Sequence, residues 1–276
     1  MHLSRGFRVA KGMNACLAVL GWLSLATTAS ADFIGFNNGV GWTLNNGAGG
    51  LPSITGNALT ITDNSGSTAN SAYFNTLQPV GGAGYLGFTA TFNYTVTENG
   101  GPAPADGFTF VIQNAGLNAV EGGGSDLGYA GMPNSASVQF NIWPYNGGGL
   151  GTNYYTGGNI GSSNSPGYLD VSPVNLSSGD TIAVTLKYDA AAQTLTETLL
   201  DTTTLDTFST TFTGVDIAAA VGGNTAYVGF TGGDGLGTST QVISDVAFQT
   251  PEPGSLTLLF TGLGIAAIAF RRVRRG

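Results

Sequence analysis

Apolar and polar residues alternate along much of this chain, and that alternation is its main structural signal. In residues 88–96 every second side chain is apolar, which is typical of a β-strand with one buried face. The two runs 181–188 and 194–200 are joined by a short link, so we expect a hairpin there. Only residues 215–221 predict a helical turn. In all, the pattern predicts strands at 42–44, 58–62, 71–74, 85–97, 107–113, 136–143, 181–188, 194–200, 206–212, 226–231 and 242–248.

The composition favours the same all-β fold class. The chain has 276 residues, of which 45 are glycine and only 9% are charged. Short strands joined by tight turns fit this composition better than helices do. Sandwiches of this size commonly form one domain. We therefore predict a single antiparallel β-sandwich over residues 32–249.

Basic residues are confined almost entirely to the two ends of the chain. Residues 32–250 hold 15 of the 16 acidic residues and one basic residue, Lys187, which gives this segment a net charge of −14. A surface this acidic repels the phosphate backbone of nucleic acids. The charge pattern therefore argues against a nucleic-acid partner.

Residues 1–31 have the pattern of a secretory signal peptide. A basic start is followed by an apolar run and by Ala29-Ser30-Ala31, so we expect export and cleavage before Asp32. A lipoprotein signal that ends at Cys16 is the less favoured alternative. The only histidine, His2, and the only cysteine both lie in this leader. Their position excludes Ser-His, Cys-His and His-metal chemistry from the rest of the chain.

A lone acidic residue, Asp106, stands at the entry of the predicted strand 107–113. A carboxylate held at the end of a rigid strand can accept hydrogen bonds from neighbouring hydroxyls at little cost in side-chain entropy, which suits a neutral polyol ligand. The alternative is that Asp106-Gly107 is only a turn, because both residue types are common in turns. Three apolar side chains of the strand share one face: Phe108, Phe110 and Ile112.

Three segments in this order resemble the L-type (legume-type) lectin family. They are the Ala105-Asp106-Gly107 strand entry, the glycine-rich loop 121–129 and the strand 137–146 that runs into an Asn/Gly loop. The resemblance spans residues 33–248 and includes residues 227–233 near its end. It implies a concanavalin-like β-sandwich of the jelly-roll type that binds a carbohydrate.

The resemblance also implies the roles of individual site residues. Asp106 matches the sugar-binding carboxylate of the strand entry, and Asn146 matches the side-chain amide donor, although Tyr145 competes for that position. The remaining matches are the loop that donates a backbone N–H, at Gly123, Gly124 or Ser125, and the variable loop that selects the sugar, at Gly232, Gly233 and Asp234.

The chain departs from the lectin pattern at the metal positions. Family members carry a Glu and an Asp on the long strand, followed by further carboxylates and a His, whereas this chain has Gln139 and Asn141. No acidic residue lies between Asp126 and Asp170. Hard cations need several carboxylate oxygens, so we expect no metal cofactor. A weak calcium site that uses Asn141 and carbonyls is the less favoured alternative.

Residues 144–168 are rich in glycine, proline, asparagine and tyrosine and contain no charged residue. We therefore expect a long loop region, and loops of that length are often functional. A sugar can stack on the ring face of Tyr145, Tyr154 or Tyr155, but burial of these rings under the loop is an equally good interpretation.

The C-terminal segment 250–276 has three parts. Pro251-Glu252-Pro253 is followed by an uncharged apolar run at 255–270 and then by four arginines. This pattern resembles the PEP-CTERM sorting signal of bacterial surface proteins, which implies processing near Pro-Glu-Pro by an exosortase-type membrane protease. The alternative is a permanent anchor, although a helix of about 16 residues rises only roughly 24 Å. The arginines would stay cytoplasmic and leave the sandwich outside the inner membrane.

Together these features predict an exported, non-catalytic protein that binds a carbohydrate or exopolysaccharide at the cell surface. A structural matrix protein with a degenerate site is the alternative, and the missing metal ligands favour it. Glycoside hydrolysis needs a close pair of carboxylates, and no strand carries such a pair. We interpret Glu197 and Asp201 as solvated.

Overall fold

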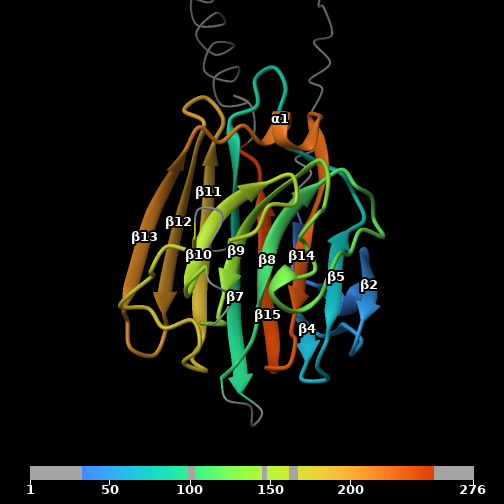
Figure 1. The fold of residues 1–276 in the computed structure, drawn as a ribbon. Helices are drawn as coiled ribbons and strands as arrows, with labels where there is room; N and C mark the ends of the chain where they lie inside the picture. Colours follow the sequence, from blue (N-terminus) through green and yellow to red (C-terminus); the bar gives the residue numbers. More distant parts are fainter. Residues whose placement is uncertain (1–32, 99–102, 145–147, 162–166, 252–276) are drawn as a thin grey trace, which may run out of the picture.

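The computed structural model describes residues 33–98, 103–144, 148–161 and 167–251, which form two antiparallel sheets packed face to face (Figure 1). The β8 sheet runs in the order β10 (Gly151–Thr156), β9 (Ser135–Asn141), β8 (Gly107–Gln113), β14 (Thr225–Gly233), β5 (Ala69–Phe74) and β2 (Trp42–Ala48), and β6 (Gln78–Pro79) pairs with β14. The β7 sheet runs in the order β13 (Thr207–Thr213), β12 (Thr194–Asp201), β11 (Ile182–Asp189), β7 (Gly87–Glu98), β15 (Ser239–Gln249), β4 (Ala58–Asp63) and β3 (Ser53–Thr55), and β1 (Phe33–Ile34) pairs with β15. This architecture confirms the predicted all-β sandwich.

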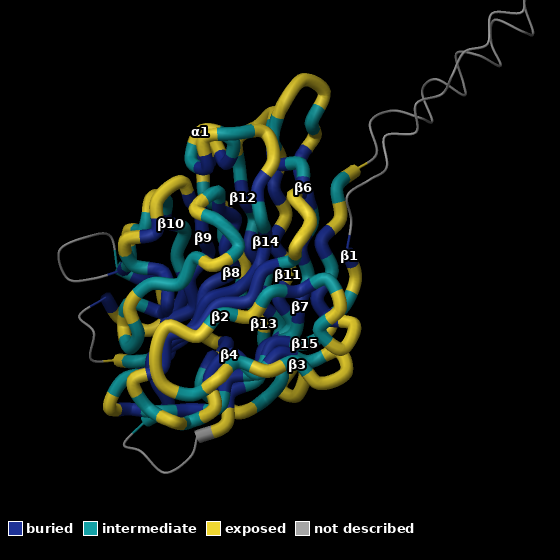
Figure 2. The backbone as a smooth tube through the Cα atoms, turned by 90° about the vertical axis from the view of Figure 1, so that its right-hand side faces the viewer, coloured by how far each residue is buried: buried dark blue, intermediate teal, exposed yellow. Residues whose placement is uncertain are grey.

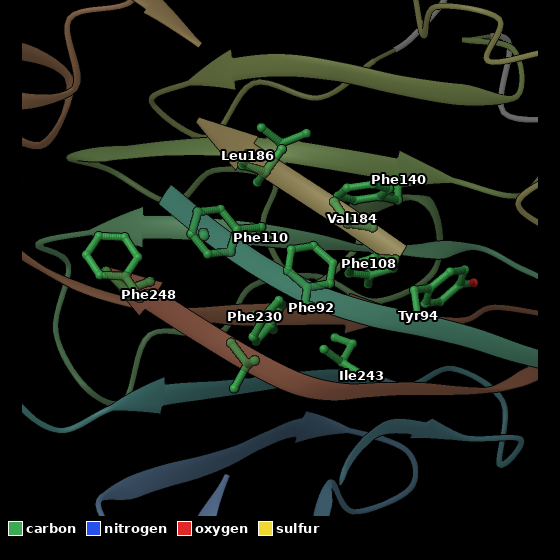
Figure 3. Packing of buried hydrophobic residues seen from close by; sticks show 14 of the residues in the cluster. Phe92, Tyr94, Phe108, Phe110, Phe140, Val184, Leu186, Phe230, Ile243 and Phe248 are labelled. Carbon is green, nitrogen blue, oxygen red and sulfur yellow. The ribbon is translucent and has the colours of Figure 1, made fainter. Parts of the chain in front are cut away.

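Aromatic side chains fill the space between the two sheets (Figure 3). Phe92 of β7 meets Phe230 of β14 with ring centroids 5.1 Å apart, and Phe108 stacks on Phe140 at 4.4 Å. Phe108, Phe110 and Ile112 are all buried in this core, which confirms that they share the inner face of their strand. Aromatic rings in contact bury large apolar areas and contribute further through their ring geometry. Figure 2 shows the buried residues concentrated on the central strands.

The predicted strand 107–113 has the bounds of β8, and most other predicted strands lie within a few residues of observed ones. The hairpin is confirmed, because β11 and β12 pair along their whole length from Ile182 with Asp201 to Asp189 with Thr194. The predicted helical turn is the short helix α1 (Ile217–Val221). Asp216 caps its start by accepting the N–H of Ala219, and Gly222 ends it with φ of +70°.

The prediction of a continuous loop over residues 144–168 is wrong for part of that range. Gly151–Thr156 forms the edge strand β10, which pairs with β9 from Asn141 to Ala136. Its sequence is polar and begins with glycine, so it lacks the apolar alternation that identified the other strands. Pairing with a neighbouring strand, rather than its own pattern, makes it extended.

The predicted signal peptide at 1–31 and most of the predicted sorting signal, from Glu252 onward, lie outside the described residues, whereas Pro251 is described and exposed. Among the residues that the structure describes, no helix has both the length and the apolar character needed to cross a membrane.

Candidate functional site

Asp106 lies just before β8, at the end of the sheet opposite α1. Its backbone N–H donates to the carbonyl of Gly233 in β14 (3.0 Å), and its own carbonyl accepts the N–H of Ile142, which follows β9 (2.9 Å). The peptide bond from Ala105 to Asp106 is cis, and the carbonyl of Ala105 accepts the hydroxyl of Ser239 (2.7 Å). Hydrogen bonds to three strands or strand ends therefore fix the backbone that carries this carboxyl group.

Two glycine-containing loops lie beside the Asp106 carboxyl group. A Cβ atom on Gly235 would lie 3.3 Å from Asp106 Oδ2, and one on Gly124 would lie 3.7 Å from the same atom. Gly124 begins the 3-10 turn η2 (Gly124–Asp126), and its N–H donates to the carbonyl of Asp234 (2.9 Å). The two loops are thus bonded to each other beside the carboxyl group, and the surface around it is formed by backbone.

Gly107 and Gly233 allow close packing at the same end of the sheet. A Cβ atom on Gly107 would lie 2.0 Å from the carbonyl oxygen of Phe140, and one on Gly233 would lie 2.6 Å from that of Gly124. Backbone atoms cannot move aside as a flexible side chain can, so a larger residue at either position would displace β9 or the η2 loop. These two glycines therefore support the position of Asp106 and of the loop beside it.

The other predicted site residues differ in their surroundings. Asp234 is fully buried, and its Oδ1 accepts the backbone N–H of Thr68 (2.8 Å), so its carboxylate fixes the segment before β5 while its carbonyl bonds to Gly124. Ser125 is exposed within η2. Asn146 lies outside the described residues, as does its competitor Tyr145.

Burial makes the Asp106 carboxyl group unusually hard to ionise. Only 5% of the residue is exposed. Its pKa rises to about 7, first because burial disfavours the charged form and then because of the negative charges of Asp234 and Asp126, while hydrogen bonding from the backbone of Gly235 acts in the opposite direction. Burial also raises the pKa of Asp234, against the hydrogen bond from Thr68. Asp106 is therefore an acceptor whose charge changes near neutral pH.

Sequence reasoning missed two apolar residues at this site. A Cβ atom on Gly237 would lie 2.8 Å from the ring of Trp143 and 2.9 Å from Cβ of Ala105, so the half-buried Trp143 packs directly beside the strand entry. Leu236 is fully exposed at the tip of the same loop. The sequence offered a signal, since Gln139, Asn141 and Trp143 stand at successive alternate positions of the predicted strand 136–143, and such positions share one face of a strand.

The tyrosines of the 144–168 region favour the burial interpretation. Tyr155 is buried, and Tyr154 packs against Phe212 of β13 with ring centroids 6.1 Å apart. Tyr154 therefore packs between the sheets, whereas Tyr155 lies on the other face of β10 and packs edge-on against Tyr168 with ring centroids 6.0 Å apart.

The residues at the two metal positions do not fit a metal ion. Gln139 and Asn141 are both fully buried, and each points its amide N–H₂ group at oxygen atoms: Asn141 Nδ2 donates to the carbonyl of Trp143 (2.9 Å), and Gln139 Nε2 donates to that of Asn159 (2.8 Å). A hard cation needs oxygen ligands directed at it, preferably charged ones, whereas these groups present hydrogen atoms. Within the described ranges, no three His, Cys, Asp or Glu side chains are grouped to hold a metal.

The interpretation of Glu197 and Asp201 as solvated is wrong. Glu197 is fully buried and Asp201 is 2% exposed. Glu197 Oε2 accepts the hydroxyl of Thr152 in β10 (2.6 Å), which links the two sheets, and Oε1 has no hydrogen-bond partner. Burial raises the pKa of Glu197 to about 7. Asp201 Oδ1 instead accepts the backbone N–H groups of Thr203 and Thr204 in the following turn.

Comparison with known proteins identifies a family and a set of similar structures. Residues 32–256 match the model of the legume lectin domain. Basic winged bean lectin, solved with Tn-antigen, superposes with a TM-score of 0.65 at 20% identity over 81% of this chain and 99% of that one. Arcelin-5, a lectin-like defense protein of Phaseolus vulgaris, gives 0.65 at 16% identity over 80% and 98%. The metal-free form of lectin I-B4 from Griffonia simplicifolia gives 0.66 at 17% identity over 80% and 100%.

Proposed function

Because the chain belongs to the legume lectin domain family, we propose that it is an exported carbohydrate-binding protein whose sugar site is centred on Asp106. Family membership points to a binding protein and not to an enzyme. The observation that carries the site is the approach of two glycine loops, at Gly124 and Gly235, to a single largely buried carboxyl group.

The chemistry of this site suits a neutral polyol. A carboxylate accepts hydrogen bonds from two adjacent hydroxyls, and partial burial strengthens such bonds because water competes less. The half-buried ring of Trp143 and the exposed Leu236 add apolar surface at the rim. Carbohydrates combine hydroxyl groups with apolar ring faces, so a small set of polar groups beside an apolar surface matches them.

We further propose that the chain is delivered to the cell surface by its two terminal signals. The support is the sequence alone: a signal peptide at 1–31 and the three-part segment that begins with Pro251-Glu252-Pro253. An exosortase-type protease would remove the C-terminal segment after a transient stay in the inner membrane. The released domain would then bind exopolysaccharide or another surface glycan.

A glycan array tests the sugar site. The purified protein is compared with Asp106→Asn, which keeps the shape but replaces a charged acceptor by a weaker one. Charge-assisted hydrogen bonds contribute on the order of 1.5–3 kcal/mol each, so affinity for the bound glycan should fall roughly ten- to a hundredfold. Asp189→Asn is the matched control, because this exposed aspartate is the last residue of β11, at the opposite end of the sandwich.

Unchanged affinity in folded Asp106→Asn would remove the proposed site. If the wild-type chain bound no glycan at all, the structural matrix protein would become the better interpretation of this fold.

Intact-mass measurement of the surface-released protein tests delivery. We expect a chain that begins at Asp32 and ends near Thr250 to Gly254. Recovery of a chain that retains the terminal arginines would contradict processing and favour a permanent anchor.

A further inference from the structure

We propose that the side-chain amides of Gln139 and Asn141 do the work of a metal ion in this domain, so that the segments around the sugar site are held in place without any cation. The proposal concerns the order of these segments, and its consequence for sugar binding rests on the proposed function. Below, the two side chains are called the amide clasp.

The two members of the amide clasp occupy alternate positions on β9 and therefore point to the same face. Both are fully buried. In the strand register Asn141 lies between Gly107 of β8 and Gly151 of β10, and Gln139 lies between Thr109 and Asn153. The clasp thus sits directly beside the residue that follows Asp106.

Asn141 joins the two sides of the β9–β10 connection. Its Nδ2 donates to the carbonyl of Trp143 (2.9 Å), where the chain leaves β9, and to the carbonyl of Gly149 (2.5 Å), just before β10 begins. A single –NH₂ group has two hydrogens, and here they connect both ends of the connection to one side chain. This is the arrangement that a cation achieves by binding two carbonyl oxygens.

Gln139 forms hydrogen bonds to two segments that follow β10 in the sequence. Its Nε2 donates to the carbonyl of Asn159 (2.8 Å) and contacts the hydroxyl of Ser137 (3.2 Å), while its Oε1 accepts the hydroxyl of the buried Tyr168 (3.0 Å). Asn153 adds a bond from its Nδ2 to the carbonyl of Gly167 (2.7 Å). Neutral amides therefore connect β9 to both segments that follow β10.

A neutral amide avoids the large desolvation cost of a buried ion. A buried carboxylate without a cation carries an uncompensated charge, whereas a buried amide is satisfied by ordinary hydrogen bonds. Replacing carboxylates by amides at these two positions thus removes the need for a metal and supplies the donors that the carbonyl oxygens require. The loss of the metal and the replacement of the carboxylates by amides belong together, because either change alone would leave buried polar atoms unsatisfied.

The clasp also affects the sugar site directly. It fixes the carbonyl of Trp143, whose ring lies beside Gly237, close to Ala105, the residue that precedes Asp106. The position of that ring then depends on Asn141 and not on bound calcium or manganese. Sugar affinity should accordingly be insensitive to chelators.

Hydrogen exchange and thermal unfolding of the full chain test the clasp without any sugar. EDTA, calcium or manganese at millimolar concentration should leave the wild-type melting temperature and the exchange of the amides in residues 148–156 unchanged, because stabilisation by a ligand requires binding to the folded state. A shift of several degrees, or slower exchange on adding either metal, would overturn the proposal.

Two variants test the amides themselves. Asn141→Asp keeps the shape but turns both donors into acceptors that face carbonyl oxygens, so exchange in residues 148–150 should accelerate at least tenfold. Gln139→Met removes the donors without adding charge and should accelerate exchange near Asn159.

Asn114→Asp is the matched control, since its Nδ2 also bridges two carbonyls, those of Val221 (3.0 Å) and Thr225 (2.9 Å), at the other end of the sandwich. Unaltered exchange in both test variants would refute the clasp.

These readouts separate the clasp from the sugar proposal. If EDTA does not change the rate of hydrogen exchange and the chain binds no glycan, the clasp is supported and only the proposed function is removed. Glycan binding that is lost in EDTA overturns the clasp and leaves the function standing.

Discussion

Two buried acids of this sandwich, Asp106 and Glu197, have almost the same electrostatics and very different surroundings. Each is at most 5% exposed, and burial raises the pKa of each to about 7. Asp106 stands at the end of a sheet, where two backbone loops approach its carboxyl group. Glu197 lies in the middle of β12 and accepts one hydroxyl, that of Thr152, across the sandwich.

The comparison shows that burial and a raised pKa do not by themselves identify a binding site. Structural carboxyl groups are perturbed by the same desolvation as functional ones. What distinguishes Asp106 is its place at a sheet end, beside two loops that present backbone rather than side chains to its carboxyl group. Glu197 is enclosed by the two sheets, so no ligand can reach it, and its effect must appear in stability.

The largest expected effect concerns the stability of Glu197→Gln. The pKa of Glu197 is 4.5 in an unperturbed chain and about 7 in the fold, so the folded protein keeps this proton to higher pH. Its contribution to stability is complete below about pH 4.5 and is lost as the pH rises through about 7. Glu197→Gln removes this titration. Between about pH 4 and about pH 8, the free energy of unfolding of the wild type should therefore fall by roughly 3 kcal/mol relative to that of the variant.

Urea unfolding at the two pH values measures this difference. Sugar affinity should not change in Glu197→Gln, which separates this residue from Asp106. An equal pH dependence of stability in the variant and the wild type would show that Glu197 does not titrate in this range.

The contrast between the two acids was only partly visible in the sequence. The run Leu195, Glu197, Leu199 alternates on one face, and that alternation indicated burial of the glutamate, but residue type favoured a solvated reading. The bounds of β8 and the three residues on its inner face were predicted correctly, because the apolar side chains of Phe108, Phe110 and Ile112 alternate along that strand. Apolar alternation therefore carried most of the fold.

The parts of the site that could not be predicted depend on contacts between distant segments. Gly235 is far from Asp106 in sequence, and only the pairing of β14 with β8 brings them together. The edge strand β10 follows from its pairing with β9 and not from its own polar sequence. Trp143 was placed at the end of a strand, but nothing in the sequence showed that its ring lies against Gly237.

A smaller effect is expected on the pH dependence of sugar binding. If the ionised Asp106 accepts the sugar hydroxyls, protonation near its pKa of about 7 should weaken binding. Affinity should thus fall about tenfold between about pH 8 and about pH 6, since roughly one carboxyl in ten stays ionised one unit below the pKa. Titration calorimetry across this range measures the change, and Asp106→Asn should bind weakly at every pH. A wild type with constant affinity would show that the charge of Asp106 is not required.

The smallest expected effect is that of a single methyl group at Gly124. This residue has φ of +63°, and its Cβ would lie 3.7 Å from Asp106 Oδ2. Gly124→Ala should lower stability by about 1 kcal/mol because L-residues disfavour this backbone region. Gly214→Ala is the matched control, since Gly214 has φ of +69° and open space around its Cβ. Both variants should lose similar stability, but only Gly124→Ala should lose sugar affinity, by a few-fold, because its methyl group occupies space beside the Asp106 carboxyl group. Equal affinity in the two variants would place the ligand away from the η2 loop and leave Asp106 as a buried acid of the same kind as Glu197.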